Sequence, residues 1–183
     1  RIKNMKNGAD DYIDFNEETY SAYISTNEEY NTNILRYSYS SMLTPSSVYD
    51  YNMDTGEKVL LKQREIPGKG YNQDLYEAKT IYATSRDGER VPIYLVYRKD
   101  MKKSAPQPLL LYSYGSYGST SDPYFSSTRL SLLDRGVIYA LTNVRGSQIY
   151  GRRSYDDGKM LNKKNTFNDF IDAGKFLVSE GYT

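Results

Sequence analysis

The first third of the chain alternates between two kinds of side chain at the period of a β-strand. Between positions 34 and 40 this alternation separates a strongly apolar face from a mixed one, as in a strand whose two faces meet different surroundings. The first face carries Leu35, Tyr37 and Tyr39, and the second carries Ile34, Arg36 and Ser38. We expect a strand here and three more between polar turns, at 21–25, 47–52 and 58–62.

Four strands of this length predict one antiparallel sheet. Asp54, Thr55 and Gly56 separate the last two strands and predict a hairpin turn in which Gly56 takes a positive φ. A lone four-stranded sheet leaves one face uncovered, so we expect one blade of a β-propeller or part of a sandwich. We assign it to residues 1–66, because Pro and Gly interrupt the pattern within 66–70 and predict a domain boundary there.

Residues 67–183 follow a different pattern. Strands at 77–84 and 92–98 are expected to form a hairpin around the Asp87-Gly88 turn. Two further segments, 108–114 and 137–142, are rich in aliphatic side chains. They are expected to be strands that are buried on both faces.

Two helices are expected among these strands. Asp122 and Pro123 are typical of a helix start, with an N-cap followed by Pro at the first helical position, and Gly136 marks the expected end. A last helix is expected over 166–180, where Thr166 and Asp169 have the spacing of a capping box. Its predicted apolar face carries Phe167, Phe170, Ile171, Gly174 and Leu177. Strands and helices in this order predict an α/β domain with a mostly parallel sheet.

Composition adds that tyrosine must form much of the core. The chain has 21 Tyr but 5 Phe and no Trp, and its mean hydropathy is −0.74, so aliphatic core material is scarce. Its 24 Lys and Arg balance 23 Asp and Glu without a long block of either sign. This balance argues against a nucleic-acid or membrane-surface partner.

Two residue types are missing, and each excludes a class of chemistry. The absence of Cys excludes disulfides and thiolate sites and fits a cytoplasmic location. The absence of His means that a Ser-His-Asp catalytic triad cannot be complete within these residues. Because the chain also begins at Arg1 and ends at Thr183, we interpret it as a fragment of a longer protein.

A glycine-rich loop, Gly115 to Gly118, follows the first apolar strand. Open α/β sheets bind ligands at the carboxyl ends of such strands, although a tight strand-to-helix turn would also explain these glycines. Neither a dinucleotide fingerprint nor a phosphate-binding loop is present. The sequence therefore predicts no cofactor and no metal site.

Two long stretches resemble a known family. The segment PLLLYSYGSYGSTSDPYFSSTRLSLLDRGVIYALTNVRG, followed by YGRRSYDDGKMLNKKNTFNDFIDAGKFLVSEGY, is similar to the first half of the catalytic domain of the prolyl oligopeptidase family. Upstream, LRYSYSSMLTPSSVYDYNMDTGEKVLLKQREIPG resembles the last propeller blade of its oligopeptidase B branch. The implied fold is α/β, the N-terminal half of an α/β-hydrolase domain (67–183) preceded by the last blade of a β-propeller (1–66).

The resemblance implies a serine endopeptidase that cleaves short peptides after Arg or Lys with a Ser-His-Asp triad. The nucleophile elbow of the family would lie shortly after Thr183, so the fragment alone is predicted to be inactive. Its implied partners are short peptides with basic residues. Sequence gives no oligomeric state.

Three site residues carry over. Tyr114, in Tyr112-Ser113-Tyr114-Gly115, matches the family's oxyanion-hole tyrosine, a role that suits a phenolic donor. Asp122 matches the first of two acids of the basic-residue subsite, with Tyr124 replacing the second. The alternative for Asp122 is the helix N-cap described above. Tyr117 matches an aromatic residue of the substrate pocket, with simple packing as its alternative.

The chain departs from the family after Val144. Where the family usually reads Arg-Gly-Gly-Gly-Glu, this sequence has Arg145-Gly146-Ser147-Gln148-Ile149, which makes the basic preference less secure than the family. Another acyl hydrolase on the same scaffold, such as an esterase or aminopeptidase, therefore stays open. So does a non-catalytic propeller protein that only binds.

Overall fold

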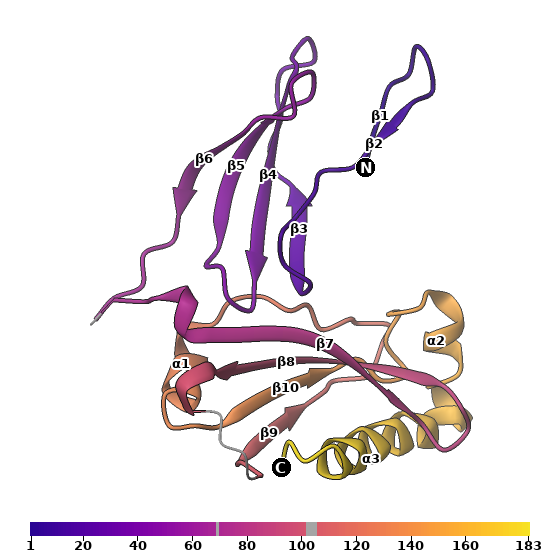
Figure 1. Cartoon of the computed structure of the whole chain (residues 1–183). Helices are drawn as coiled ribbons and strands as arrows, with labels where there is room; N and C mark the ends of the chain where they lie inside the picture. Colours follow the sequence, from indigo (N-terminus) through magenta and orange to yellow (C-terminus); the bar gives the residue numbers. More distant parts are fainter. Residues whose placement is uncertain (69, 102–105) are drawn as a thin grey trace.

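The computed structural model describes residues 1–68, 70–101 and 106–183 and contains two separate four-stranded sheets. Figure 1 shows the N-terminal sheet standing on the edge of a second layer, in which the other sheet is flanked by helices. The predicted boundary at 66–70 lies between the two sheets, and its Lys69 is outside the described residues. No described helix is both long enough and apolar enough to cross a membrane.

The N-terminal sheet is antiparallel throughout, as predicted. Its strands run in the order β3 (Tyr20–Ile24), β4 (Ile34–Ser41), β5 (Ser47–Asn52) and β6 (Lys58–Gln63). Gly56 has a φ of +77° in the turn between the last two strands, so the hairpin prediction is confirmed. A short ribbon that the sequence pattern did not predict, β1 (Ile2–Lys3) with β2 (Asp10–Asp11), precedes this sheet.

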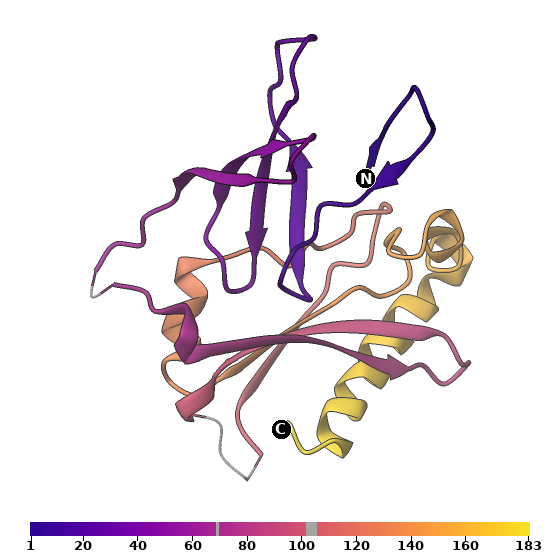
Figure 2. The same ribbon diagram turned by 45° about the horizontal axis from the view of Figure 1, so that its top comes forward.

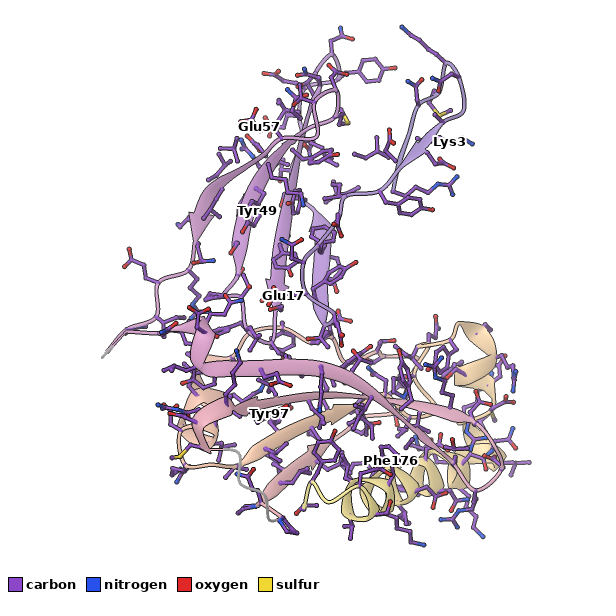
Figure 3. All side chains as sticks on the ribbon, in the orientation of Figure 1. Lys3, Glu17, Tyr49, Glu57, Tyr97 and Phe176 are labelled. Carbon is purple, nitrogen blue, oxygen red and sulfur yellow. The ribbon has the colours of Figure 1, made fainter. Side chains whose placement is uncertain are left out.

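Tyrosine forms the interior of this sheet. Tyr37, Tyr39 and Tyr51 are buried together, and the ring of Phe15 stacks on Tyr39 with 5.2 Å between centroids. Figure 3 shows the neighbouring Tyr49 on the same sheet and Glu17 beside its lower end. Glu17 accepts the Tyr39 hydroxyl at 2.5 Å, which satisfies a polar group that the tyrosine core would otherwise bury alone.

The second sheet has the strand order β7-β8-β10-β9, with β7 (Tyr76–Thr84), β8 (Arg90–Arg98), β9 (Leu109–Tyr112) and β10 (Ile138–Thr142). β8 is antiparallel to both of its neighbours, and β9 pairs with β10 in parallel. The expectation of a mostly parallel sheet is therefore wrong for this part of the chain. The short turn between β7 and β8 forces an antiparallel pair, and the crossover through α1 makes the parallel one.

The aliphatic side chains gather in this second layer. One face of the sheet packs against α3, and the most buried members of this core include Ile93, Leu95, Ala140, Val144 and Leu177. The opposite face packs in a separate cluster with Leu133 of α1. β9 departs from the prediction of burial on both faces, because Leu110 and Tyr112 are exposed. It lies at the edge of the described sheet, where its outer face has no covering helix.

The helices are α1 (Ser127–Leu133), α2 (Arg152–Asp156) and α3 (Lys163–Ser179), with 3₁₀ turns η1 (Gln73–Leu75), η2 (Lys99–Met101) and η3 (Met160–Asn162). α1 begins after Ser126, so the prediction that Asp122 caps this helix is wrong. The four residues between Asp122 and the start of α1 form an irregular segment beneath the N-terminal sheet. Asp122 contacts Tyr23 of that sheet instead of capping the helix.

α3 also differs from its prediction. It begins three residues before Thr166, and its buried side chains are Thr166, Asp169, Ala173 and Leu177. Phe167 is 60% exposed, and Phe170 and Ile171 are also exposed, so the predicted apolar face is wrong except for Gly174 and Leu177. The reason is a buried arginine, Arg145, which draws the polar side of the helix inward.

Candidate functional site

The loop that follows β9 carries two of the predicted site residues. Figure 2 shows this segment running from the sheet toward the N-terminal domain and α2. Tyr114, the predicted oxyanion donor, has a side chain that is 51% exposed, and Tyr117 is 86% exposed. Neither belongs to the buried core of the described residues, so both phenols are open to a ligand from solvent.

Glycine sets the path of this loop. Gly115 has a φ of +62°, and a Cβ on it would lie 2.5 Å from Cγ2 of Val144. Gly146, on the facing loop after β10, has a φ of +97°, and its Cβ would lie 2.2 Å from the carbonyl oxygen of Gly115. Both positions combine a left-handed backbone with space for hydrogen alone. The two loops therefore meet backbone to backbone directly beside Tyr114.

A buried arginine anchors the facing loop. Nη2 of Arg145 lies 2.6 Å from Oδ1 of Asp169, which is fully buried in α3. Nη1 of Arg145 lies 2.7 Å from Oδ2 of Asp87 in the β7–β8 turn. Hydrogen bonds to these carboxylates raise the pKa of the guanidinium, since they favour its charged form. The pairing ties one loop to a helix and a hairpin that lie far apart in the sequence.

The remaining contacts of this loop explain how the chain tolerates its departure from the family sequence. Ser147, where the family has a second glycine, is fully buried and donates its hydroxyl to the carbonyl of Val144 at 2.7 Å. The amide of Gly118 donates to the carbonyl of Gly146 at 2.9 Å. The loops on either side of the site thus form one hydrogen-bonded unit.

Lys163, the first residue of α3, contacts the Tyr114 loop directly. Its ammonium lies 2.5 Å from the carbonyl oxygen of Gly115 and 2.8 Å from Oγ of Ser116. Sequence reasoning did not identify Lys163 or the Arg145 pair, because the partners are 48 and 24 positions apart. Both lysine and arginine look like ordinary surface residues in a one-dimensional pattern.

Asp122 lies where the two domains meet. The hydroxyl of Tyr23, on β3 of the N-terminal sheet, donates a hydrogen bond to Oδ2 of Asp122. This hydrogen bond raises the pKa of Tyr23, because ionising the phenol would remove the donated proton, and burial and the charge of the carboxylate act in the same direction. No pattern in the sequence indicates Tyr23 as a partner, because it is 99 positions away from Asp122.

Two cavities flank Asp122. One, of about 200 Å³, lies on the side of the N-terminal sheet, and the other, of about 270 Å³, lies toward β9, β10 and α1. Asp122 and Tyr124 line both, and Arg129 lines the second. Within the described ranges neither cavity is lined by Tyr114 or Tyr117. The predicted site residues thus form two groups, an exposed phenol loop and a carboxylate at the domain contact.

The exposed phenols can donate hydrogen bonds, and the carboxylate can bind a positively charged group. A phenol can donate a hydrogen bond to a developing negative charge, and a carboxylate between two cavities can bind a cation. The chain contains no histidine to act as a general base. A Ser-His-Asp mechanism at Tyr114 therefore needs its histidine base from outside these residues.

Both parts of the chain match domains of known proteins. The profile described as "Prolyl oligopeptidase family" matches residues 123–183, and "Prolyl oligopeptidase, N-terminal beta-propeller domain" matches residues 1–64. "Dipeptidyl aminopeptidase BI" of Pseudoxanthomonas mexicana is 51% identical over 96% of this chain and 24% of its own length. "Protease 2" of Moraxella lacunata is 41% identical over 93% of this chain and 25% of its own length.

Solved structures give the same result in three dimensions. Oligopeptidase B from Trypanosoma brucei, in a closed form with covalently bound antipain, is 41% identical with a TM-score of 0.84, over 93% of this chain and 24% of that one. Oligopeptidase B from Leishmania major is 35% identical with a TM-score of 0.85, over 100% of this chain and 26% of that one.

The chain thus spans about a quarter of the length of these relatives. The N-terminal sheet is a propeller blade rather than part of a sandwich, and the second layer is the first part of an α/β-hydrolase domain. The chain matches the propeller domain and then the catalytic domain of one family, and the two relatives named above are 41–51% identical to it. This chain belongs to the prolyl oligopeptidase family.

Proposed function

We propose that this chain is part of a cytoplasmic serine endopeptidase that hydrolyses short peptides, with the Ser, His and Asp of its triad outside these residues. The protein would act by acyl transfer, in which a serine attacks the scissile carbonyl and the carbonyl oxygen becomes negative. The first part of the hydrolase domain contributes a hydrogen-bond donor for that oxygen. The propeller blade contributes one wall beside the substrate.

One observation carries this proposal, namely the placement of Tyr114. Its half-exposed phenol follows the carboxyl end of β9 on a loop whose backbone is fixed by Gly115 and Gly146. The carboxyl end of such a strand is where open α/β sheets place their ligands. A donor that is already oriented stabilises the developing oxyanion without reorganising during the reaction.

Asp122 supports a preference for basic substrates. Its carboxylate is half-buried and lines two cavities, so an ammonium or guanidinium group bound there would meet a charge that water screens only in part. Tyr124 stands where the family has a second acid. We therefore propose a preference for Arg or Lys that rests on a single carboxylate.

A conservative substitution at Tyr114 tests the role of its hydroxyl. In the protein that joins this chain to the triad, Tyr114→Phe is expected to lower kcat by about ten- to a thousandfold with little change in KM, because the donor acts mainly on the transition state. Tyr82→Phe, which removes an exposed phenol on β7, is the matched control and should leave kcat unchanged. An unaltered kcat in Tyr114→Phe would remove Tyr114 from the mechanism.

A second candidate is an aminopeptidase that releases dipeptides, favoured by the 51% identity with Dipeptidyl aminopeptidase BI. Asp122 would then bind the α-ammonium of the substrate rather than a basic side chain. Pairs of peptides that differ only in a free or acetylated amino terminus distinguish the two. Faster cleavage of the free peptide supports the aminopeptidase, and equal cleavage after Arg or Lys supports the endopeptidase.

A further inference from the structure

Lys163 occupies a position that is unfavourable for a lysine. It is the first residue of α3, where the helix dipole favours negative charge. Its side chain is half-buried, and this burial lowers the pKa of its ammonium. Among the described residues no carboxylate lies within ion-pair distance of it. Within the part of the chain that the structure describes, an ion pair thus does not account for a cation here.

Both hydrogen-bond partners of this ammonium lie on the loop that carries Tyr114, and its other contact is the ring of Phe167 on α3, with 6.0 Å from Nζ to the centroid. Nζ donates to the carbonyl oxygen of Gly115 at 2.5 Å and lies 2.8 Å from Oγ of Ser116. Gly115 is bonded to Tyr114, so the lysine fixes a peptide group directly beside the predicted donor. Hydrogen bonds from a charged donor are stronger than those between neutral groups.

The loop needs such a fixed point, because its backbone is not relaxed. Gly115, Tyr117 and Gly118 have φ values of +62°, +54° and +71°. Tyr117 is not a glycine, and a left-handed tyrosine is a strained conformation that persists where surrounding contacts hold it. The glycine contacts with Val144 and Gly146 support the loop from one side, and Lys163 supports it from α3.

We propose that Lys163 is a positioning residue for the oxyanion donor. Its ammonium holds the Gly115 carbonyl and the Ser116 hydroxyl, and so determines the direction in which Tyr114 presents its phenol. The inference rests on the proposed function, because it gives Lys163 a role only through Tyr114. It adds a residue from α3 to a site otherwise built from the β9 loop.

A double-mutant cycle in the protein that contains both this chain and the triad tests the inference. Lys163→Met, which keeps the side-chain length but loses charge and donors, should lower kcat about ten- to a hundredfold with KM changed less than about threefold. In a Tyr114→Phe background the same substitution should have no further effect on kcat, because the group that it positions is gone. Lys163→Arg, which keeps the charge and the donors, should recover most of the loss.

Lys164→Met is the matched control, since Lys164 is the next residue of α3 and is exposed; its kcat should equal that of the wild type. If Lys163→Met fails to fold, Lys163→Gln, which loses the charge, takes its place in the cycle. Losses that multiply in the double variant, or an unchanged kcat in Lys163→Met, would overturn the inference while leaving Tyr114 in place. A Tyr114→Phe variant with full activity would instead refute the proposed function and the inference together.

Discussion

The two sheets of this chain are built from different core material. The propeller blade buries Tyr37, Tyr39 and Tyr51. The hydrolase layer instead buries aliphatic side chains on both faces of its central strands, such as Leu95 on one face of β8 and Val96 on the other. A tyrosine core needs polar partners such as Glu17 for its hydroxyls. An aliphatic core needs only close packing.

The two sheets also differ in how far their faces are covered within these residues. Every residue of β6 is exposed, including Val59, Leu60 and Leu61, because the blade has no second layer here to cover it. β8 and β10 are covered on both sides. The hydrolase layer should therefore carry most of the stability of the chain, and substitutions in the two sheets should differ in their cost.

The largest effect is expected at the buried ion pair of the hydrolase layer. Asp169→Asn leaves the guanidinium of Arg145 buried with one charged partner fewer, and should lower the free energy of unfolding by about 3–5 kcal/mol. The change can be measured by denaturant titration followed by circular dichroism. The control is Asp50→Asn, which breaks the more exposed pair with Arg36 in the blade and should have a much smaller effect. Equal losses would contradict the proposed difference between the sheets.

A matched pair of leucines gives the next largest effect. Leu95→Ala in β8 opens a cavity in a site with no solvent exposure and should cost about 2–5 kcal/mol. Leu60→Ala in β6 removes a side chain that is 49% exposed and should change stability by less than about 0.5 kcal/mol. A Leu60→Ala variant as unstable as Leu95→Ala would mean that the blade face is covered in solution.

The smallest effect concerns acid sensitivity. Hydrogen bonds from Arg86 hold the pKa of Asp172 below its ordinary range. A carboxylate with a depressed pKa stabilises the fold at pH values above its unfolded pKa of about 4, and this contribution is lost as the pH falls further. Asp172→Asn should therefore lower the melting temperature slightly at pH 7 and reduce its decline below pH 4. A melting temperature that falls with acid as steeply as in the wild type would contradict the assignment.

Local pattern predicted the strands well, because the alternation of side chains is a property of a few consecutive residues. β4 and β5 lie within one residue of their predicted bounds. The face of α3 was predicted wrongly, since Asp169 is buried by Arg145 from a loop 24 positions away. The periodicity of the helix cannot reveal a partner on a separate loop, and by itself it favours burial of the apolar Phe167.

The candidate site also combines residues that the sequence predicted with residues that it did not. Tyr114, Tyr117 and Asp122 came from resemblance to a family, and their roles stay predictions. Asp122 was also expected to cap a helix, which was wrong, because its side chain meets Tyr23 across the domain contact. Tyr23 and Lys163 were missed for a common reason. Each acts through a partner distant in sequence, and only the folded chain brings the pairs together.

Binding of a peptide aldehyde tests the central claim most directly, because the aldehyde forms a tetrahedral adduct whose oxyanion would accept a hydrogen bond from the Tyr114 hydroxyl. In the protein that carries the triad, Tyr114→Phe is predicted to weaken aldehyde binding about ten- to a thousandfold. Its affinity for the corresponding peptide alcohol, which forms no adduct, should stay unchanged. Equal affinity of wild type and variant for the aldehyde would contradict the account.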